Sequence, residues 1–256
     1  MRPAGELPAG EQYFAERPHA RPDRRELRFL YRGELLTFVV DSGVFASRGL
    51  DPGTALLIEN LDLRPTDRVL DLGCGWGAVG VAAARSAPRG EVVLTEVNRR
   101  AARLAQANLA RNGVGNASVR VGRSFEPVGT ATFDVIAANP PYRAGRELVL
   151  AMLGEAPGHL VPDGRLLVVG KGSQGIHYYQ GWLATHWAPG VRVLARGSGY
   201  RVLEARAAAG GARVERAAEG VKNRRSLGRR LRGPETTAGP ARAGGVGDPG
   251  TLNATG

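Results

Sequence analysis

The sequence predicts an α/β protein built on one mostly parallel, seven-stranded β-sheet, with a C-terminal antiparallel hairpin and helices on both faces. Two observations predict this fold. Strand-like and helix-like runs alternate between residues 66 and 206, as expected of parallel strands joined by helical crossovers. The last two strand-like runs are joined only by "GSG" at 197–199. This link is too short for a crossover, so the two strands must pair antiparallel.

The predicted elements follow one another in a regular order. Helix-like runs separate most of the strand-like runs, and the best marked of them begins after Asn98, a plausible N-cap, and ends at "NG" 112–113. The strand-like runs are 68–73, 91–97, 117–121, 133–139, 164–170, 191–196 and 200–206, and the helix-like runs are 78–87, 98–112, 146–156 and 173–187.

Two further parts flank this alternating region. Before it, "ELRFLY" and "ELLTFVV" stand on either side of "RG" at 32–33, which predicts a β-hairpin, followed by a loop and a helix from 53. After it, the chain becomes poor in apolar residues, which predicts disorder. The basic cluster at 223–232 suits either an RNA-binding arm or a merely solvated tail. We therefore expect an N-terminal element at 1–52, a main domain at 53–206 and a basic disordered tail at 207–256.

The composition favours a polyanionic partner and gives no sign of a metal site. The formal charge of +11 and the pI of about 10.8 suggest nucleic acid first, although arginine-rich composition also results from a GC-rich genome. Cys74 is the one cysteine and the four histidines are scattered, so neither a disulfide framework nor a metal cluster is expected. No apolar run approaches the ~20 residues of a membrane helix, and the N-terminus has no apolar signal region, so a cytoplasmic protein is expected.

A glycine-rich turn after the first main-domain strand predicts a cofactor site. Gly73, Gly75 and Gly77 alternate after Asp71, between a strand and a helix, where a tight backbone turn lets a ligand approach closely. The acid before the glycines would repel a pyrophosphate but suits an ammonium group, such as the amino-acid end of S-adenosylmethionine. Glu96 ends the next strand, where a carboxylate can accept from ribose hydroxyls. A glycine turn used only for packing would not explain two acids at strand ends.

The tetrapeptide "NPPY", residues 139–142, follows the fourth strand at the same carboxyl edge, where open α/β sheets bind ligands. The Asn139 side chain and the Pro140 backbone each offer a carbonyl that can accept from an exocyclic amine. Such bonds favour a pyramidal nitrogen whose lone pair can attack a methyl group. Tyr142 offers a flat face on which a base can stack. The alternative is a proline-capped strand end with a core tyrosine.

These motifs together resemble the methyltransferase small-domain family of class I S-adenosylmethionine-dependent enzymes, which have a Rossmann-like fold. The resemblance covers about 11–206 and is greatest to stand-alone members similar to the catalytic half of ribosomal RNA guanine-N2 methyltransferases. It rests on the order and spacing of five segments, 37–61, 69–82, 96–114, 134–145 and 197–206.

The resemblance also implies roles for particular segments. It places "GVF" 43–45 and "DPGT" 51–54 over the cofactor, and 139–142 around the target amine. One departure concerns the adenine contact, because family members carry an acidic or amide residue after the third strand where this chain has Arg123 and Ser124. Arginine cannot accept from the adenine amine, so Ser124 or a backbone carbonyl is expected to serve.

The predicted function is an S-adenosylmethionine-dependent N-methyltransferase acting on an exocyclic amine of RNA, with guanine N2 of ribosomal RNA as the first choice. The predicted catalytic residues are Asn139, Pro140 and Tyr142, and the predicted cofactor-binding residues are Asp71, Gly73, Gly75, Gly77, Glu96, Ser124 and Asn139. RNA is the expected partner, with no metal and no membrane. Protein glutamine N5, DNA adenine N6 and a small-molecule amine are alternative targets, and a non-catalytic RNA-binding module is an alternative of another class.

Overall fold

The computed structural model describes residues 23–46, 49–187 and 189–209. They belong to one compact unit, residues 1–217, while a second unit, 218–256, lies outside the described residues. The basic cluster at 223–232 and most of the predicted tail therefore also lie outside them. The boundaries predicted at 52 and 206 stay predictions.

A seven-stranded sheet forms the centre of the described unit, in the order β5-β4-β3-β6-β7-β9-β8. Neighbouring strands from β5 to β7 pair parallel, and β9 pairs antiparallel with both β7 and β8. This confirms the predicted mostly parallel sheet with a C-terminal antiparallel hairpin. The strands are β3 (Arg68–Leu72), β4 (Glu91–Glu96), β5 (Ala117–Val121), β6 (Phe133–Ala138), β7 (Leu160–Lys171), β8 (Val191–Gly197) and β9 (Tyr200–Arg206).

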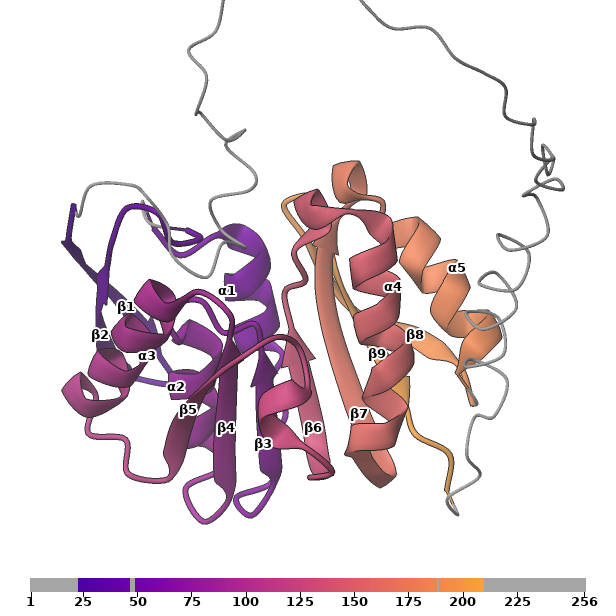
Figure 1. Ribbon diagram of the computed structural model, residues 1–256, viewed down its shortest axis with the longest axis horizontal. Helices are drawn as coiled ribbons and strands as arrows, with labels where there is room; N and C mark the ends of the chain where they lie inside the picture. Colours follow the sequence, from indigo (N-terminus) through magenta and orange to yellow (C-terminus); the bar gives the residue numbers. More distant parts are fainter. Residues whose placement is uncertain (1–22, 47–48, 188, 210–256) are drawn as a thin grey trace, which may run out of the picture. The chain divides into compact units, whose positions relative to one another are not determined.

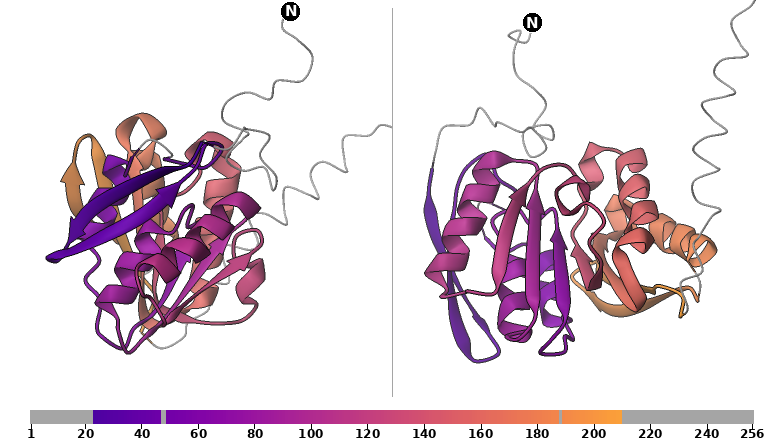
Figure 2. Two further views of the ribbon diagram at one scale, coloured as in Figure 1. Left: turned by 90° about the vertical axis from the view of Figure 1, so that its left-hand side faces the viewer. Right: turned by 60° about the horizontal axis from the view of Figure 1, so that its bottom comes forward.

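Helices cover both faces of the sheet (Figures 1 and 2). One face carries α1 (Pro52–Glu59), α2 (Ala78–Ser86) and α3 (Arg99–Arg111), and the other carries α4 (Arg146–Glu155) and α5 (Ile176–His186). Alternate strand residues feed the two hydrophobic clusters, which is why these strands read as continuous apolar runs. Short 3₁₀ turns complete the connections: η2 (Glu126–Val128), η3 (Tyr142–Ala144), η4 (Ala156–His159) and η5 (Gly172–Gln174).

The predicted N-terminal hairpin is present and packs against α3 (Figure 2). It consists of β1 (Arg25–Tyr31) and β2 (Glu34–Val40), joined at Arg32 and Gly33, whose φ angles of 49° and 85° fit a type I′ turn. Its inner residues join the hydrophobic cluster that covers the α1–α3 face of the sheet. The hairpin thus packs on the outer side of α3, as a third layer over the sheet and this helix.

Two asparagine side chains of α3 fasten the hairpin. Asn108 accepts from the Val39 N–H at 2.8 Å and donates to the Val39 carbonyl at 3.0 Å. Asn112 makes the same pair of bonds with Thr37, both at 2.9 Å. The side-chain amides thus bond the free edge of β2 as a further strand would, which satisfies backbone groups that an exposed edge leaves unpaired. The sequence analysis did not foresee this contact.

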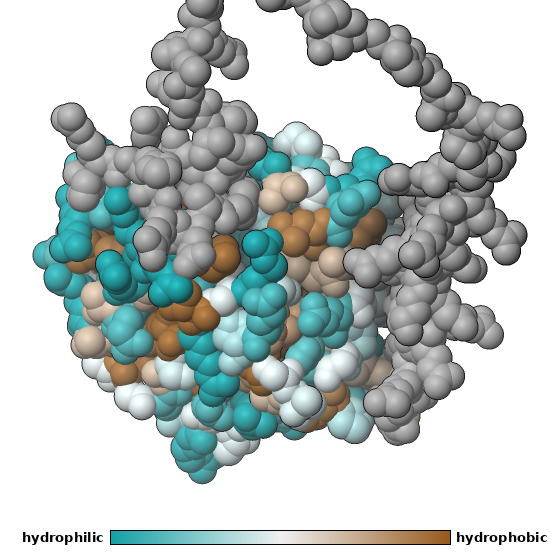
Figure 3. Space-filling model, viewed as in Figure 1, coloured by the Kyte–Doolittle hydropathy of each residue, from teal (hydrophilic) through white to brown (hydrophobic). Residues whose placement is uncertain are grey.

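The described surface is mixed in polarity. On the visible face formed by described residues, small hydrophobic patches are separated by hydrophilic side chains (Figure 3). In the part of the chain that the structure describes, no helix has both the length and the apolar character needed to cross a membrane.

Candidate active site

The sheet register brings three predicted site residues to one level of the carboxyl edge. Leu72 of β3 is paired with Thr95 of β4 on one side and with Ala138 of β6 on the other. Gly73, Glu96 and Asn139 each come directly after these paired positions. The glycine turn and the "NPPY" segment are therefore neighbours at the same rim of the sheet.

The glycine turn is open on the side where a ligand would approach. Gly73 and Gly75 have φ angles of 77° and 56°, and a Cβ on either would meet nothing within 4 Å. Gly77 differs, because with φ 90° a Cβ there would lie 3.1 Å from the Cβ of Ala105 on α3. The first two glycines thus serve backbone conformation and access, and the third also allows α3 to pack closely.

Asp71 lies beneath this turn with its carboxylate buried. The residue is 2% exposed, and its Oδ2 accepts from the Gly80 N–H of α2 at 2.8 Å. Burial raises the pKa of this carboxyl to about 7, the Gly80 bond opposes the rise, and the nearby charge of Glu96 adds to it. The carboxylate scarcely reaches the surface, and its predicted direct contact with an ammonium group therefore stays a prediction.

Glu96 bridges the glycine turn and the start of α3. Its Oε2 accepts from the Gly75 N–H and its Oε1 from the Asn98 N–H, both at 2.8 Å. Burial raises the pKa of this carboxyl, while those backbone bonds lower it. Each carboxylate oxygen keeps a second lone pair, so Glu96 retains the capacity to accept from hydroxyl groups.

Ser124 carries a buried hydroxyl without a partner among the described residues. It follows β5, whose last residue Val121 pairs with Glu96, and its φ of 49° is unusual for a residue with a side chain. An unpaired buried hydroxyl is costly, so a polar ligand group fits here. Arg123 beside it is exposed. The open glycines, the spare acceptor sites of Glu96 and this hydroxyl together fit a nucleoside-containing ligand.

The "NPPY" segment is a rigid turn. Pro141 has φ −76° and ψ 69°, and the Tyr142 N–H donates to the Pro140 carbonyl at 2.8 Å, which together form an inverse γ-turn. The bond leaves the Pro140 oxygen one lone pair for another donor. Asn139 is half-buried at the start of this turn.

Tyr142 is anchored by its hydroxyl, which donates to the Val169 carbonyl of β7 at 2.7 Å. Burial raises the pKa of this phenol well above its usual range, so Tyr142 stays protonated and does not act as a base. Next to it, a Cβ on Gly170 would lie 2.5 Å from the Tyr142 Oη. The absence of a side chain at position 170 is thus what lets the ring lie against β7.

A hydrogen-bond chain from α1 sets the orientation of the Asn139 amide. The Thr54 hydroxyl donates to the carboxylate of Asp51, which can only accept when ionised. This bond uses the single proton of the Thr54 hydroxyl, so the hydroxyl can act only as an acceptor toward Asn139. The Asn139 Nδ2 donates to it at 3.1 Å, and the Oδ1 therefore occupies the other side of the amide.

The sequence analysis missed this role of Thr54, since it assigned "DPGT" to the cofactor by resemblance alone. The available local signal was Asp51, three residues before Thr54 at a predicted helix start, where an N-cap commonly lies. In the structure Asp51 caps α1 by accepting from the Gly53 and Thr54 N–H groups at 3.0 and 3.2 Å. What links the cap to Asn139, 85 residues away in sequence, is visible only in the folded chain.

Comparisons with known proteins show what this chain is similar to. A family model described as "Methyltransferase small domain" matches residues 35–204. The chain is 34% identical over 167 residues to the uncharacterized protein YbxB of Bacillus subtilis, which covers 64% of this chain and 83% of that protein. It is also 34% identical over 199 residues to the ribosomal RNA small subunit methyltransferase C of Ectopseudomonas mendocina. This alignment covers 75% of this chain and 58% of the relative.

A solved structure is similar over the same region. The T. thermophilus 16S rRNA N2 methyltransferase RsmC, in complex with AdoMet and guanosine, matches with a TM-score of 0.63 and 28% identity. The match covers 72% of this chain and 50% of that chain. This chain therefore spans about half the length of the RsmC neighbour.

The chain belongs to the methyltransferase small domain family. Membership confirms the predicted class I methyltransferase fold and the predicted enzyme class. The cofactor predicted from the motifs, S-adenosylmethionine, is the one that this family uses.

Proposed function

We propose that this protein transfers the methyl group of S-adenosylmethionine to an exocyclic amine of RNA, with guanine N2 of ribosomal RNA as the target. The observation that carries the proposal is the fixed orientation of the Asn139 amide. With its Nδ2 bonded to Thr54, the Oδ1 is left as an acceptor beside the glycine turn. Together with the Pro140 carbonyl it makes two acceptors, which match the two N–H protons of an amine, whereas a hydroxyl has one proton to donate and a carbon has none.

Asn139 and Pro140 act together on the amine. The Asn139 Oδ1 and the remaining lone pair of the Pro140 carbonyl accept the two N–H protons of the target amine. These bonds favour a pyramidal nitrogen, whose lone pair is then less delocalised into the ring of the base and can attack the methyl group. The inverse γ-turn holds the Pro140 oxygen, and the bond to Thr54 holds the Asn139 oxygen, before the substrate arrives. Catalysis then comes mainly from alignment, and no dedicated base is required at the start.

Tyr142 supplies the stacking surface for the base. Its hydroxyl bond to Val169 and its position 5.4 Å, between ring centroids, from Tyr179 keep the ring from turning. A preset aromatic face stacks a base at low entropic cost, and stacking is worth ~1–3 kcal/mol per base. Because every base has such a face, Tyr142 favours a flat target without choosing guanine.

The proposed cofactor-binding residues are those in and around the glycine turn. Bound S-adenosylmethionine supplies an activated methyl group on a positively charged sulfonium. Glu96 would accept from its ribose hydroxyls and the Ser124 hydroxyl would meet the adenine amine. The glycine turn would let the ligand approach the backbone, and Asp71 would favour its positive charge from beneath the turn.

The choice of RNA and of guanine N2 rests on the relatives and on charge. One relative is named as a ribosomal RNA methyltransferase, and a structural neighbour is titled a 16S rRNA N2 methyltransferase with guanosine bound. The formal charge of +11 suits a polyanionic substrate. A ribosomal RNA substrate would also place the protein in the cytoplasm, as the sequence predicts.

A transfer assay tests the proposal. The purified chain is incubated with methyl-labelled S-adenosylmethionine and either 16S ribosomal RNA or intact small ribosomal subunits from a strain lacking the gene. The RNA is then digested, and its nucleosides are separated by mass spectrometry. We expect label in N2-methylguanosine with wild-type protein and none with Asn139→Ala. Label in N6-methyladenine of added DNA or in glutamine of ribosomal protein would contradict the RNA target. Cofactor binding without transfer to any acceptor would contradict the enzymatic proposal.

A further inference from the structure

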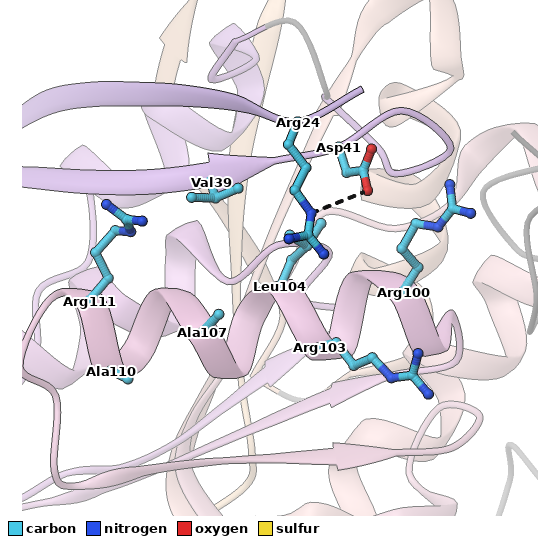
Figure 4. Close-up of a pocket in the computed structure, with 9 residues that line it drawn as sticks. All are labelled: Arg24, Val39, Asp41, Arg100, Arg103, Leu104, Ala107, Ala110 and Arg111. Atoms are coloured by element: carbon cyan, nitrogen blue, oxygen red, sulfur yellow. Dashed lines mark ion pairs between the residues drawn. The ribbon is translucent and has the colours of Figure 1, made fainter. Parts of the chain in front are cut away.

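We propose that the groove between the hairpin and α3 binds the phosphate backbone of the RNA strand that carries the target base. The inference rests on the proposed RNA substrate and adds a second binding site outside the catalytic rim. The groove has a volume of about 680 Å³. Figure 4 shows Arg24, which directly precedes β1, and three arginines of α3 around it. Its lining consists of Arg24, Val39, Asp41, Arg100, Arg103, Leu104, Ala107, Ala110 and Arg111.

The charge of the groove suits an anionic strand. Four arginines line it against one carboxylate, Asp41, which lies 3.9 Å from the Nε of Arg24. Arg111 pairs with Glu26 at 3.2 Å, and the side chains of Arg24 and Arg111 remain 73% and 44% exposed. A guanidinium has five N–H donors, so one ion pair leaves each of them able to bind phosphate.

The placement of arginines on α3 runs against helix electrostatics. Arg99, Arg100 and Arg103 all stand in the first turns of the helix, which has no acidic residue in its first turn. The N-terminus of a helix carries a partial positive charge that disfavours cations. Arg103 is the informative position, because a local rule broken without a structural gain points to function. Arg103 is exposed, and the structure gives its side chain no partner among the described residues.

The floor of the groove is shaped for a strand to lie along the helix. Ala107 and Ala110 are exposed between the arginine positions, and their short side chains leave the middle open. Arg100 and Arg111 are eleven residues apart, which is ~16 Å along a helix at 1.5 Å per residue. A groove of that length has room for several phosphates of one strand.

The groove begins at the catalytic rim. Asn98, the N-cap of α3, follows Glu96 by two residues and donates from its Nδ2 to the Gly43 carbonyl at 3.2 Å. Arg100 donates to the Ser42 carbonyl at 3.1 Å in the same loop. A strand whose target base enters the rim near this loop can therefore continue along α3 without crossing the protein.

Salt-dependent RNA binding tests the groove. The full chain and its variants are titrated into a fluorescein-labelled single-stranded RNA 12-mer of mixed sequence, by anisotropy at several salt concentrations. The variants are Arg103→Gln and the double variant Arg103→Gln/Arg111→Gln. The matched control is Arg89→Gln, an exposed arginine in the loop before β4. Calorimetry with S-adenosylmethionine checks that every variant retains the cofactor site.

Each phosphate contact contributes ~0.7 to the slope of log K against log salt for single strands. We expect the slope to shrink by about 0.7 in the single variant and about 1.4 in the double variant, with no change in Arg89→Gln. Unchanged slopes in both groove variants, while the wild type binds RNA, would overturn the groove and leave the proposed function standing. Absence of salt-dependent RNA binding by a wild type that still binds cofactor would instead overturn the RNA substrate itself. Equal losses in the groove variants and the control would show nonspecific attraction and also reject the groove.

Discussion

Replacing Thr54 by valine should slow turnover without weakening cofactor binding. The change keeps the shape of the side chain and removes the hydroxyl that donates to Asp51 and accepts from the Asn139 Nδ2. In the wild type, a flipped Asn139 amide would aim its Oδ1 at a hydroxyl whose only proton is already used. The bond is worth ~0.5–1.5 kcal/mol, and the repulsion between two acceptors adds to the preference.

The size of the effect follows from that preference. Once the hydroxyl is gone, both amide orientations become accessible and the acceptor oxygen is no longer held in one position. A loss of about 1–2 kcal/mol of transition-state stabilisation corresponds to a roughly 5- to 30-fold lower kcat. Single-turnover methylation of RNA measures this rate, and calorimetry should give a cofactor Kd within about twofold of wild type because the substitution leaves Asp71, the glycine turn and Glu96 unchanged.

Thr54→Ser is the matched control. Serine keeps the donor to Asp51 and the acceptor for Asn139, so its kcat should stay within about threefold of wild type. A wild-type rate for Thr54→Val, beside an inactive Asn139→Ala, would refute the orienting role. Equal losses in the serine and valine variants would assign the effect to altered packing at position 54 and not to the hydroxyl.

Four other predictions concern residues at or near the rim. Asn139→Ala should abolish turnover while leaving cofactor affinity within a few-fold, and a large affinity loss with activity retained would contradict the acceptor role. Ionised Asp71 favours a positively charged ligand, and the pKa of Asp71 is raised to about 7. Cofactor affinity should therefore rise as the pH increases through 7, and Asp71→Asn should flatten this pH profile. A wild-type affinity that does not change from pH 6 to 8 would be inconsistent with this prediction. The same raised pKa means that Asp71 keeps its proton up to a higher pH in the folded state than in the unfolded chain. The contribution of Asp71 to stability is therefore greatest at low pH and declines as the pH rises toward 7. Denaturant unfolding of wild type and Asp71→Asn at several pH values measures this decline. Gly170→Ala would place a Cβ 2.5 Å from the Tyr142 Oη, so it should raise the KM for RNA with little effect on cofactor binding, and an unchanged KM would show that the Tyr142 ring does not support the base.

Much of the fold was predictable because its signals are local. The central strands are apolar runs with defined ends. Asn98 and "NG" 112–113 marked the ends of α3, where the structure has Asn98 as N-cap and Gly113 at φ 61°. The antiparallel end of the sheet followed from the length of one link, since no chain can cross over in three residues. The bonds of Asn108 and Asn112 to the hairpin were not predictable, because a helical asparagine carries no mark of the strand that it will meet.

The sequence alone determined which chemical groups gather at the rim. Residues that directly follow parallel strands must meet at one edge, and this fixed the neighbourhood of Gly73, Glu96 and Asn139. Only the tertiary structure decided how these groups are used. It buried Asp71 beneath the turn, left the Ser124 hydroxyl without a partner, and set the Asn139 amide through Thr54 of a distant helix. The physical reason is that strand order and register depend on local pattern and chain length, whereas the direction of a hydrogen bond depends on which donors and acceptors the folded chain brings within about 3 Å of each other.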